Sequence, residues 1–295
     1  MNTLSNLSPE LEARLHRVYA RAEAEKADKE RNKLLEPQKS QTDPLPTNTS
    51  NSSNASAVKV TSAINLREYI QVGINGLNGK PVVISCYELQ GSNRKNYEEA
   101  HKLVLNQSLY VPTPLIFTTH FVNVVEAKNG RKQLLYADAS SVSDSEVDKM
   151  YKHLTTNYKD TFGGNNSGAW TWLNARFVQG SGDNNMDLET IIGINSDGAF
   201  ITNKKPLECK ILEDCFINLD FNGQGFPKAK SSAQSYSQGE NIKFYFPRLN
   251  VAAGFYAGSV WAGLSCVRDP LFSYSSLGVF ACAEGTASQI FGGNP

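Results

Sequence analysis

The chain has 295 residues, about 40% of them apolar and 20% charged, with 29 basic and 29 acidic side chains. This length exceeds one average domain, and the apolar content is sufficient for a core. A net charge of zero provides no long-range field to attract nucleic acid or an anionic membrane surface, so neither partner is expected.

No targeting or membrane-spanning segment is recognised. The first twenty residues carry no apolar run of signal-peptide length. The most apolar run, residues 251–267, contains glycines and serines and is too short to cross a bilayer. The five cysteines are odd in number and widely spaced, which favours free thiols in a reducing compartment. We therefore expect a cytoplasmic protein, or one assembled into a particle made in the cytoplasm.

A charged amphipathic helix is predicted within residues 1–36. Ser8 suits the N-cap and Pro9 the first helical position. A four-three-four spacing places four apolar side chains on one stripe: Leu11, Leu15, Val18 and Ala22. We expect this stripe to dock on a protein partner or on a second copy of the chain. The alternative is a solvated extension without a partner.

A disordered linker is predicted over residues 37–57, which are rich in Asn, Ser, Thr and Pro and nearly lack apolar side chains. Such a segment cannot offset its ordering entropy by burial. It contains Asn-x-Ser/Thr triplets, but without an export signal these are not expected to be glycosylated. The linker therefore serves as a tether for the helix.

Residues 58–161 alternate helical and strand-like patterns, which predicts a mixed subdomain. Helices are expected over residues 65–72, 96–106 and 143–158, and strands over residues 81–89, 115–126 and 132–138. Asn129 and Gly130 lie between the last two strand-like runs and predict a hairpin. Ser143 and Glu146 form a capping-box pattern ahead of an apolar helical face.

Residues 162–295 are β-rich by pattern. Strands are expected over residues 170–178, 188–194, 199–202, 209–212, 215–221, 242–246, 255–267 and 277–283. Residues 195–198 read Asn-Ser-Asp-Gly and predict a second hairpin. Short strands with frequent turns favour a sandwich-like half. The chain is therefore expected to be α+β, with a mixed half followed by a β-rich half.

One pair of residues is a candidate for catalysis. His120 is the only histidine in an apolar strand-like run, and Cys86 lies on a neighbouring predicted strand. A thiol activated by an imidazole is a nucleophile, but nothing in the spacing brings the two together, and no third group is marked to orient the base. The alternative for His120 is a core histidine satisfied by one hydrogen bond.

Neither a metal nor a cofactor is expected. No two cysteines have the two-residue gap of a zinc site, and His-x-x-x-His does not occur. The acidic cluster over residues 183–189 lacks the glycine and the distal glutamate of a calcium loop, which favours a polar loop before a strand. No phosphate-binding glycine loop is found.

Trp170 and Trp172 share one face of a predicted strand because they are two residues apart. Aromatic side chains on a sheet face can stack on sugar rings, although they more commonly form the core of a β-sandwich. These two residues are the candidates for ligand binding.

Three functions follow from these patterns. The first is a non-enzymatic structural or assembly protein that docks into a larger, virion- or tail-like particle, with itself as one partner. The second is a module that binds glycans or other ligands through its aromatic face. The third is an enzyme with a scattered site containing Cys86 and His120.

Overall fold

The computed structural model describes residues 65–156, 168–258, 261–273 and 277–285 of the protein. The helix predicted within residues 1–36, with its stripe of Leu11, Leu15, Val18 and Ala22, and the linker predicted over residues 37–57 lie outside the described residues. The described residues belong to one compact unit.

The described residues have an α+β fold, in which a mixed part precedes a β-rich part, as the sequence predicts. The helical elements are η1 (Leu66–Glu68), α2 (Tyr97–Leu105), α3 (Pro114–Lys128), α4 (Asp144–Thr155) and η2 (Asp183–Asn185). The strands are β1 (Tyr69–Asn75), β2 (Pro81–Ser85), β3 (Trp170–Gln179), β4 (Met186–Ile194), β5 (Phe200–Pro206), β6 (Cys215–Asn218), β7 (Asn241–Tyr245), β8 (Ala252–Ala257), β9 (Ala262–Arg268) and β10 (Cys282–Glu284).

The strands form two sheets, one with the order β1-β2-β10 and one with the order β5-β4-β3-β8-β9-β7-β6. Neighbouring strands are antiparallel except for the parallel pair β7 and β9. All strands of the β-rich half lie in the seven-stranded sheet except β10, which pairs with β2 of the first half. The two halves are therefore joined by shared hydrogen bonding.

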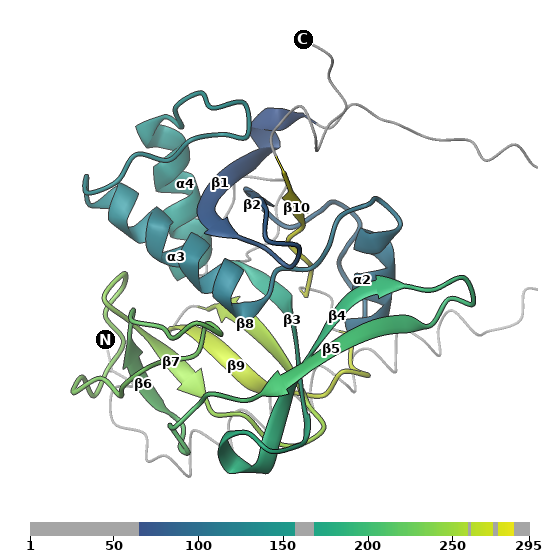
Figure 1. Ribbon diagram of the computed structural model, residues 1–295. Coiled ribbons are helices and arrows are strands. Elements are labelled where there is room, and N and C mark those ends of the chain that lie inside the picture. The colour runs from purple at the N-terminus through teal and green to yellow at the C-terminus, as the bar shows by residue number, and fades with distance from the viewer. Residues whose placement is uncertain (1–64, 157–167, 259–260, 274–276, 286–295) are drawn as a thin grey trace, which may run out of the picture. The chain divides into compact units, whose positions relative to one another are not determined.

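Helix α3 lies at the centre of the fold, where it contacts β1 of the small sheet, β3 of the large sheet and helix α4 (Figure 1). It is buried along most of its circumference, from Ile116 to Val125. Phe117 packs with its ring 4.9 Å from that of Phe255 on β8 and 5.3 Å from that of Phe280. The large sheet is therefore covered by helix α3, which lies between the two sheets, and not directly by a second sheet as in a β-sandwich.

The prediction of a strand over residues 115–126 is wrong, because these residues belong to α3. Thr113 caps the helix by accepting a hydrogen bond from the Ile116 amide, and Pro114 occupies the first turn. A helix buried on nearly all sides has no polar face, so its sequence lacks the 3.6-residue stripe that identifies helices. The β-branched residues of this run then mimic a buried strand.

The hairpin predicted at Asn129 and Gly130 is also wrong, since the pair ends α3. The Asn129 amide donates to the Val125 carbonyl, and Gly130 has a φ of +70°, the left-handed conformation common after a helix. Residues 132–138 form no strand and make only single bridges, such as that between Tyr136 and Ile70.

The helix predicted over residues 65–72 is reduced to the single turn η1, after which β1 begins. Tyr69, Ile70 and Val72 are buried while Gln71 is exposed, and this alternation is typical of a strand with one solvated side. Residues 209–212 are not a strand, and residues 255–267 divide between β8 and β9. Of residues 277–283, only the last two belong to a strand, β10.

Several other predictions that rest on local signals are confirmed. Helices α2 and α4 occur where expected, capped by Asn96 and Ser143, and α2 has a complete capping box. The hairpin at residues 195–198 joins β4 to β5, and Gly198 adopts a φ of +79° in its turn. Strands β2, β3, β6 and β7 also lie within or close to the predicted ranges.

We expect Gly225→Ala to destabilise the protein by about 2 kcal/mol or more. Gly225 has a φ of +86°, and a Cβ atom there would lie 2.1 Å from the Leu115 amide nitrogen at the start of α3. The matched control is Gly223→Ala in the same loop, where an added Cβ meets nothing within 4 Å. Urea unfolding of both variants measures the difference, and equal stabilities would contradict the close packing of this loop on α3.

Candidate functional site

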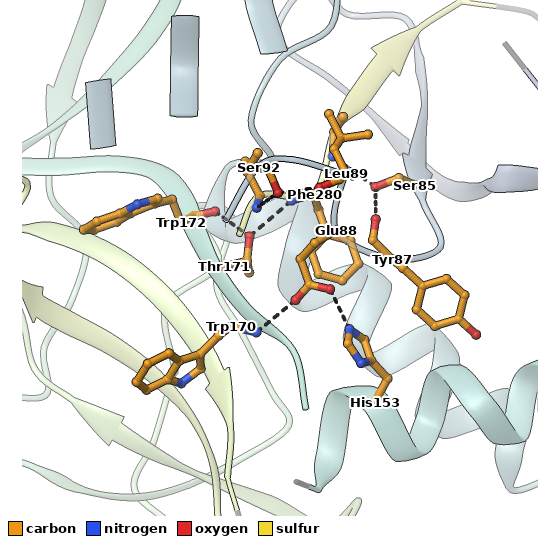
Figure 2. Close-up of polar contacts among 12 residues, drawn as sticks. Ser85, Tyr87, Glu88, Leu89, Ser92, His153, Trp170, Thr171, Trp172 and Phe280 are labelled. Atoms are coloured by element: carbon orange, nitrogen blue, oxygen red, sulfur yellow. Dashed lines mark hydrogen bonds and ion pairs between the residues drawn. The ribbon is translucent and has the colours of Figure 1, made fainter. Parts of the chain in front are cut away.

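The buried segment before β10 is held by three hydroxyl groups from three other parts of the chain (Figure 2). The amides of Val279, Phe280 and Ala281 donate, in order, to the hydroxyls of Ser92, Thr171 and Ser85, at 3.0, 3.2 and 3.0 Å. Each hydroxyl donates in turn to a backbone carbonyl, those of Leu89, Trp172 and Tyr87 respectively. We call this arrangement the hydroxyl seam.

Glu88 extends the hydroxyl seam to helix α4. One carboxylate oxygen accepts a hydrogen bond from the Trp170 amide at 2.9 Å, and the other lies 2.7 Å from Nε2 of His153 (Figure 2). The side chains of Glu88 and His153 are only 15% and 17% exposed. The carboxylate therefore ties the start of β3 and the end of α4 to the loop that follows β2.

Two histidines are buried as neutral side chains in apolar surroundings. His120 lies on α3 with its ring about 6 Å from those of Phe117 and Phe280, and neither of its ring nitrogens has a hydrogen-bond partner among the described residues. His101 on α2 is buried against Tyr97, and its Nε2 has no hydrogen-bond partner in the part of the chain that the structure describes. Burial lowers the pKa of each to about 3, so neither is suited to act as a base near neutral pH.

Cys86 and His120 do not form a catalytic pair. Within the described residues, the Cys86 thiol makes its one hydrogen bond to the Arg67 carbonyl, at 3.9 Å. Burial, assisted by the nearby charge of Glu146, raises the pKa of Cys86 to about 12, whereas an activated nucleophile needs a lowered pKa. Burial likewise raises the pKa of Cys209 to about 11.

Trp170 and Trp172 point to the same side of β3 but differ in environment. Trp172 is fully buried, with its indole N–H donating to the Lys95 carbonyl and its ring 5.6 Å from that of Tyr97. Trp172 is thus a core residue with no ring face open to a sugar. Trp170 is half-buried and lies beneath the guanidinium of Arg268, 5.0 Å from its ring centre.

The acidic cluster over residues 183–189 is used within the protein. The Asp187 carboxylate accepts hydrogen bonds from the Ser181 and Gly182 amides, and Glu189 forms ion pairs with Arg176 and Lys204. No group of three or more His, Cys, Asp or Glu side chains in the described residues is arranged to hold a metal ion.

Comparisons of the chain with protein-family models, with curated proteins and with solved structures find no match. In the part of the chain that the structure describes, no helix combines the length and the apolar character needed to cross a membrane.

The residues of the hydroxyl seam and Glu88 were not identified from the sequence. Ser85 and Glu88 fall inside the run predicted as a buried strand, and a polar residue in such a run is the one local signal of a buried polar role. Their partners lie far along the chain, up to 196 residues away for Ser85 and Ala281. No local pattern indicates such a pairing.

We expect Thr171→Val to destabilise the protein by about 1 to 3 kcal/mol, because it leaves the buried Phe280 amide without an acceptor while preserving the side-chain shape. The control is Thr190→Val on β4, whose hydroxyl makes only an exposed 3.4 Å contact with the Asn203 carbonyl. Urea unfolding provides the comparison. A Thr171→Val protein as stable as the control would show that the hydroxyl is not needed in the seam.

The buried histidines predict a stability that falls as the pH is lowered. Their folded-state pKa of about 3 lies below the ordinary value of 6.5, so between these values the unfolded chain binds more protons. Each histidine then contributes a slope of about 1.4 kcal/mol per pH unit, with full stability above pH 6.5. We expect His120→Met to reduce the slope between pH 6.5 and 5 in urea unfolding, and a double variant with His101→Met to reduce it further. Unchanged slopes would contradict neutral burial.

Proposed function

We propose that the protein is a non-enzymatic assembly protein that joins copies of itself into a larger particle, and that the outer strand β5 is its contact surface. The helix predicted within residues 1–36 provides a second contact on its tether. The observation that carries the proposal is the exposure of β5.

Strand β5 is the outermost strand of the large sheet and is hydrogen-bonded to β4 on one side. Every residue of β5 after Phe200 is exposed. The β4–β5 hairpin extends away from the other strands (Figure 1). At the opposite edge, β6 is only four residues long. A long exposed edge strand offers a row of backbone donors and acceptors to another strand, whereas a short one does not.

Two exposed apolar side chains lie at the β5 edge of the large sheet. Ile192 on β4 and Ile201 on β5 are 47% and 46% exposed. Ile201 pairs with Gly193, and Ile192 precedes Gly193 at the register irregularity of β4. Two exposed isoleucines beside an exposed edge strand lose contact with water when a second strand is added, and this burial favours association.

The charges of β5 favour an antiparallel second copy as the partner. Lys204 and Lys205 lie at one end of the strand and Phe200 and Ile201 at the other. In an antiparallel pair related by a two-fold axis, the lysines of one copy lie beside the apolar end of the other, so that like charges do not face each other. Lys204 is also neutralised by Glu189, at 3.4 Å.

We expect the full chain to form an oligomer that Ile201→Lys dissociates, because a buried charge at the β5 contact is costly. The measurement is absolute mass by light scattering over a hundredfold range of concentration. The control is Leu212→Lys, which introduces the same charge at an apolar side chain that is 58% exposed and lies outside the β4–β5 hairpin.

A truncated chain beginning at Val58 separates the two proposed contacts. If assembly depends on β5, the truncated chain keeps the oligomer. An oligomer that survives Ile201→Lys but is lost on removal of residues 1–57 would contradict the role of β5 and assign assembly to the predicted helix.

A further inference from the structure

The surface has a hollow of about 330 Å³ where the end of α3 meets the start of α4. The two helices pack on each other, and residues 129–143 join them (Figure 1). The last turn of α3, the segment that follows it and the first turn of α4 all line the hollow. We call it the α3–α4 hollow. Its volume lies at the lower end of the range for small-molecule sites, which suits a ligand of the size of an amino acid.

The floor of the α3–α4 hollow is apolar. Val142 and Val147 are buried, and Ala127 at the end of α3 is half-buried beside them. The short side chain of Ala127 leaves space above the two valines. An apolar group of a ligand loses contact with water when it enters this space, and this burial favours binding.

Hydrogen bonds fix the wall of the hollow formed by residues 130–133. The Arg131 amide donates to the Glu126 carbonyl at 2.9 Å and so continues from the end of α3. The side-chain amide of Gln133 donates to the Ser141 hydroxyl at 2.9 Å, which ties this wall to the segment that leads into α4. A wall that is ordered before a ligand arrives loses little conformational entropy on binding.

Lys132 adds a fixed positive charge to the hollow. Its ammonium donates to Oδ1 of Asn123 at 2.5 Å, and the side-chain amide of Asn123 donates to the Val72 carbonyl on β1 at 2.8 Å. Asn123 is buried and neutral, so it holds the ammonium in place without cancelling its charge. A negative group of a ligand is therefore favoured beside this wall.

Two further side chains that line the hollow have opposite charges. Arg131 follows α3, and Asp144 is the first residue of α4. Among the described residues, neither side chain forms an ion pair, and the two do not pair with each other across the hollow. A ligand with one negative and one positive group is complementary to both.

We propose that the α3–α4 hollow binds a free amino acid with a branched apolar side chain. Arg131 receives the carboxylate beside the charge of Lys132, Asp144 receives the ammonium, and the side chain lies on the apolar floor. A ligand with a single charge leaves either Arg131 or Asp144 without a partner. The site goes beyond the assembly proposed for β5 and is independent of it, because no residue of β4 or β5 lines the hollow.

Ligand-observed NMR titrations of the full chain with three small molecules test the proposal. Leucine has both charges, isocaproate lacks the ammonium group and isoamylamine lacks the carboxylate. The three have the same branched apolar chain, so differences in affinity report on the charged groups alone. We expect saturable binding of leucine, and binding about tenfold weaker for each of the other two.

Two variants assign the charged groups. Asp144→Asn should weaken the binding of leucine and isoamylamine but not that of isocaproate. Arg131→Gln should weaken the binding of leucine and isocaproate but not that of isoamylamine. The controls are Glu98→Gln on α2 and Lys80→Gln before β2, two exposed residues that do not line the hollow, and both should bind like the parent chain. Thermal unfolding confirms that each variant is folded.

Three results would overturn the proposal. One is the absence of saturable leucine binding at millimolar concentration. Another is equal affinity of the parent chain for leucine and its two analogues, which would show that the charges take no part. The third is a pair of variants that both bind leucine as tightly as the controls do. The first two tests use the parent chain and so do not depend on the folding of any variant.

Discussion

The fold depends on one buried stretch of backbone, residues 277–282, which is completely shielded from solvent between the two sheets. A buried backbone needs a partner for every amide and carbonyl, and most of this stretch is not part of a regular strand. Ser85, Ser92 and Thr171 supply the missing acceptors from three separate segments. The hydroxyl seam thereby fixes where β2, the loop after it and β3 meet.

This constraint determines how the large sheet is covered. Gly278 bonds to the backbone of Trp170 and Trp172 while β10 pairs with β2, so the small sheet lies beside β3 and α3 packs between the two sheets. Glu88 then brings the end of α4 to the same place through His153. One face of the large sheet is buried as a result, whereas Trp170, Tyr256, Lys243 and Phe216 on its other face are only half-buried.

The ionisable groups in the interior are neutral or have structural roles, whereas the surface carries the strand proposed for contact with a partner. The thiol of Cys86 and the imidazole of His120 are held in their neutral states by burial, and the two oxygens of Glu88 are used to join segments. The outermost strand β5, by contrast, lies at an exposed edge of the large sheet. We propose assembly through β5 on the basis of this exposed edge.

The sequence alone determined the elements whose signals are local: the capped helices α2 and α4, the β4–β5 hairpin, and the placement of Trp170 and Trp172 on one face of β3. Tertiary structure decided the rest, since burial on all sides made a helix of residues 114–128 despite their strand-like composition. It also separated the two tryptophans, because only Trp172 lies beneath the elements that the hydroxyl seam brings together. The alignment of Trp170, Tyr256 and Lys243 across the large sheet depends on strand register, and register is set by long-range pairing that no short stretch of sequence encodes.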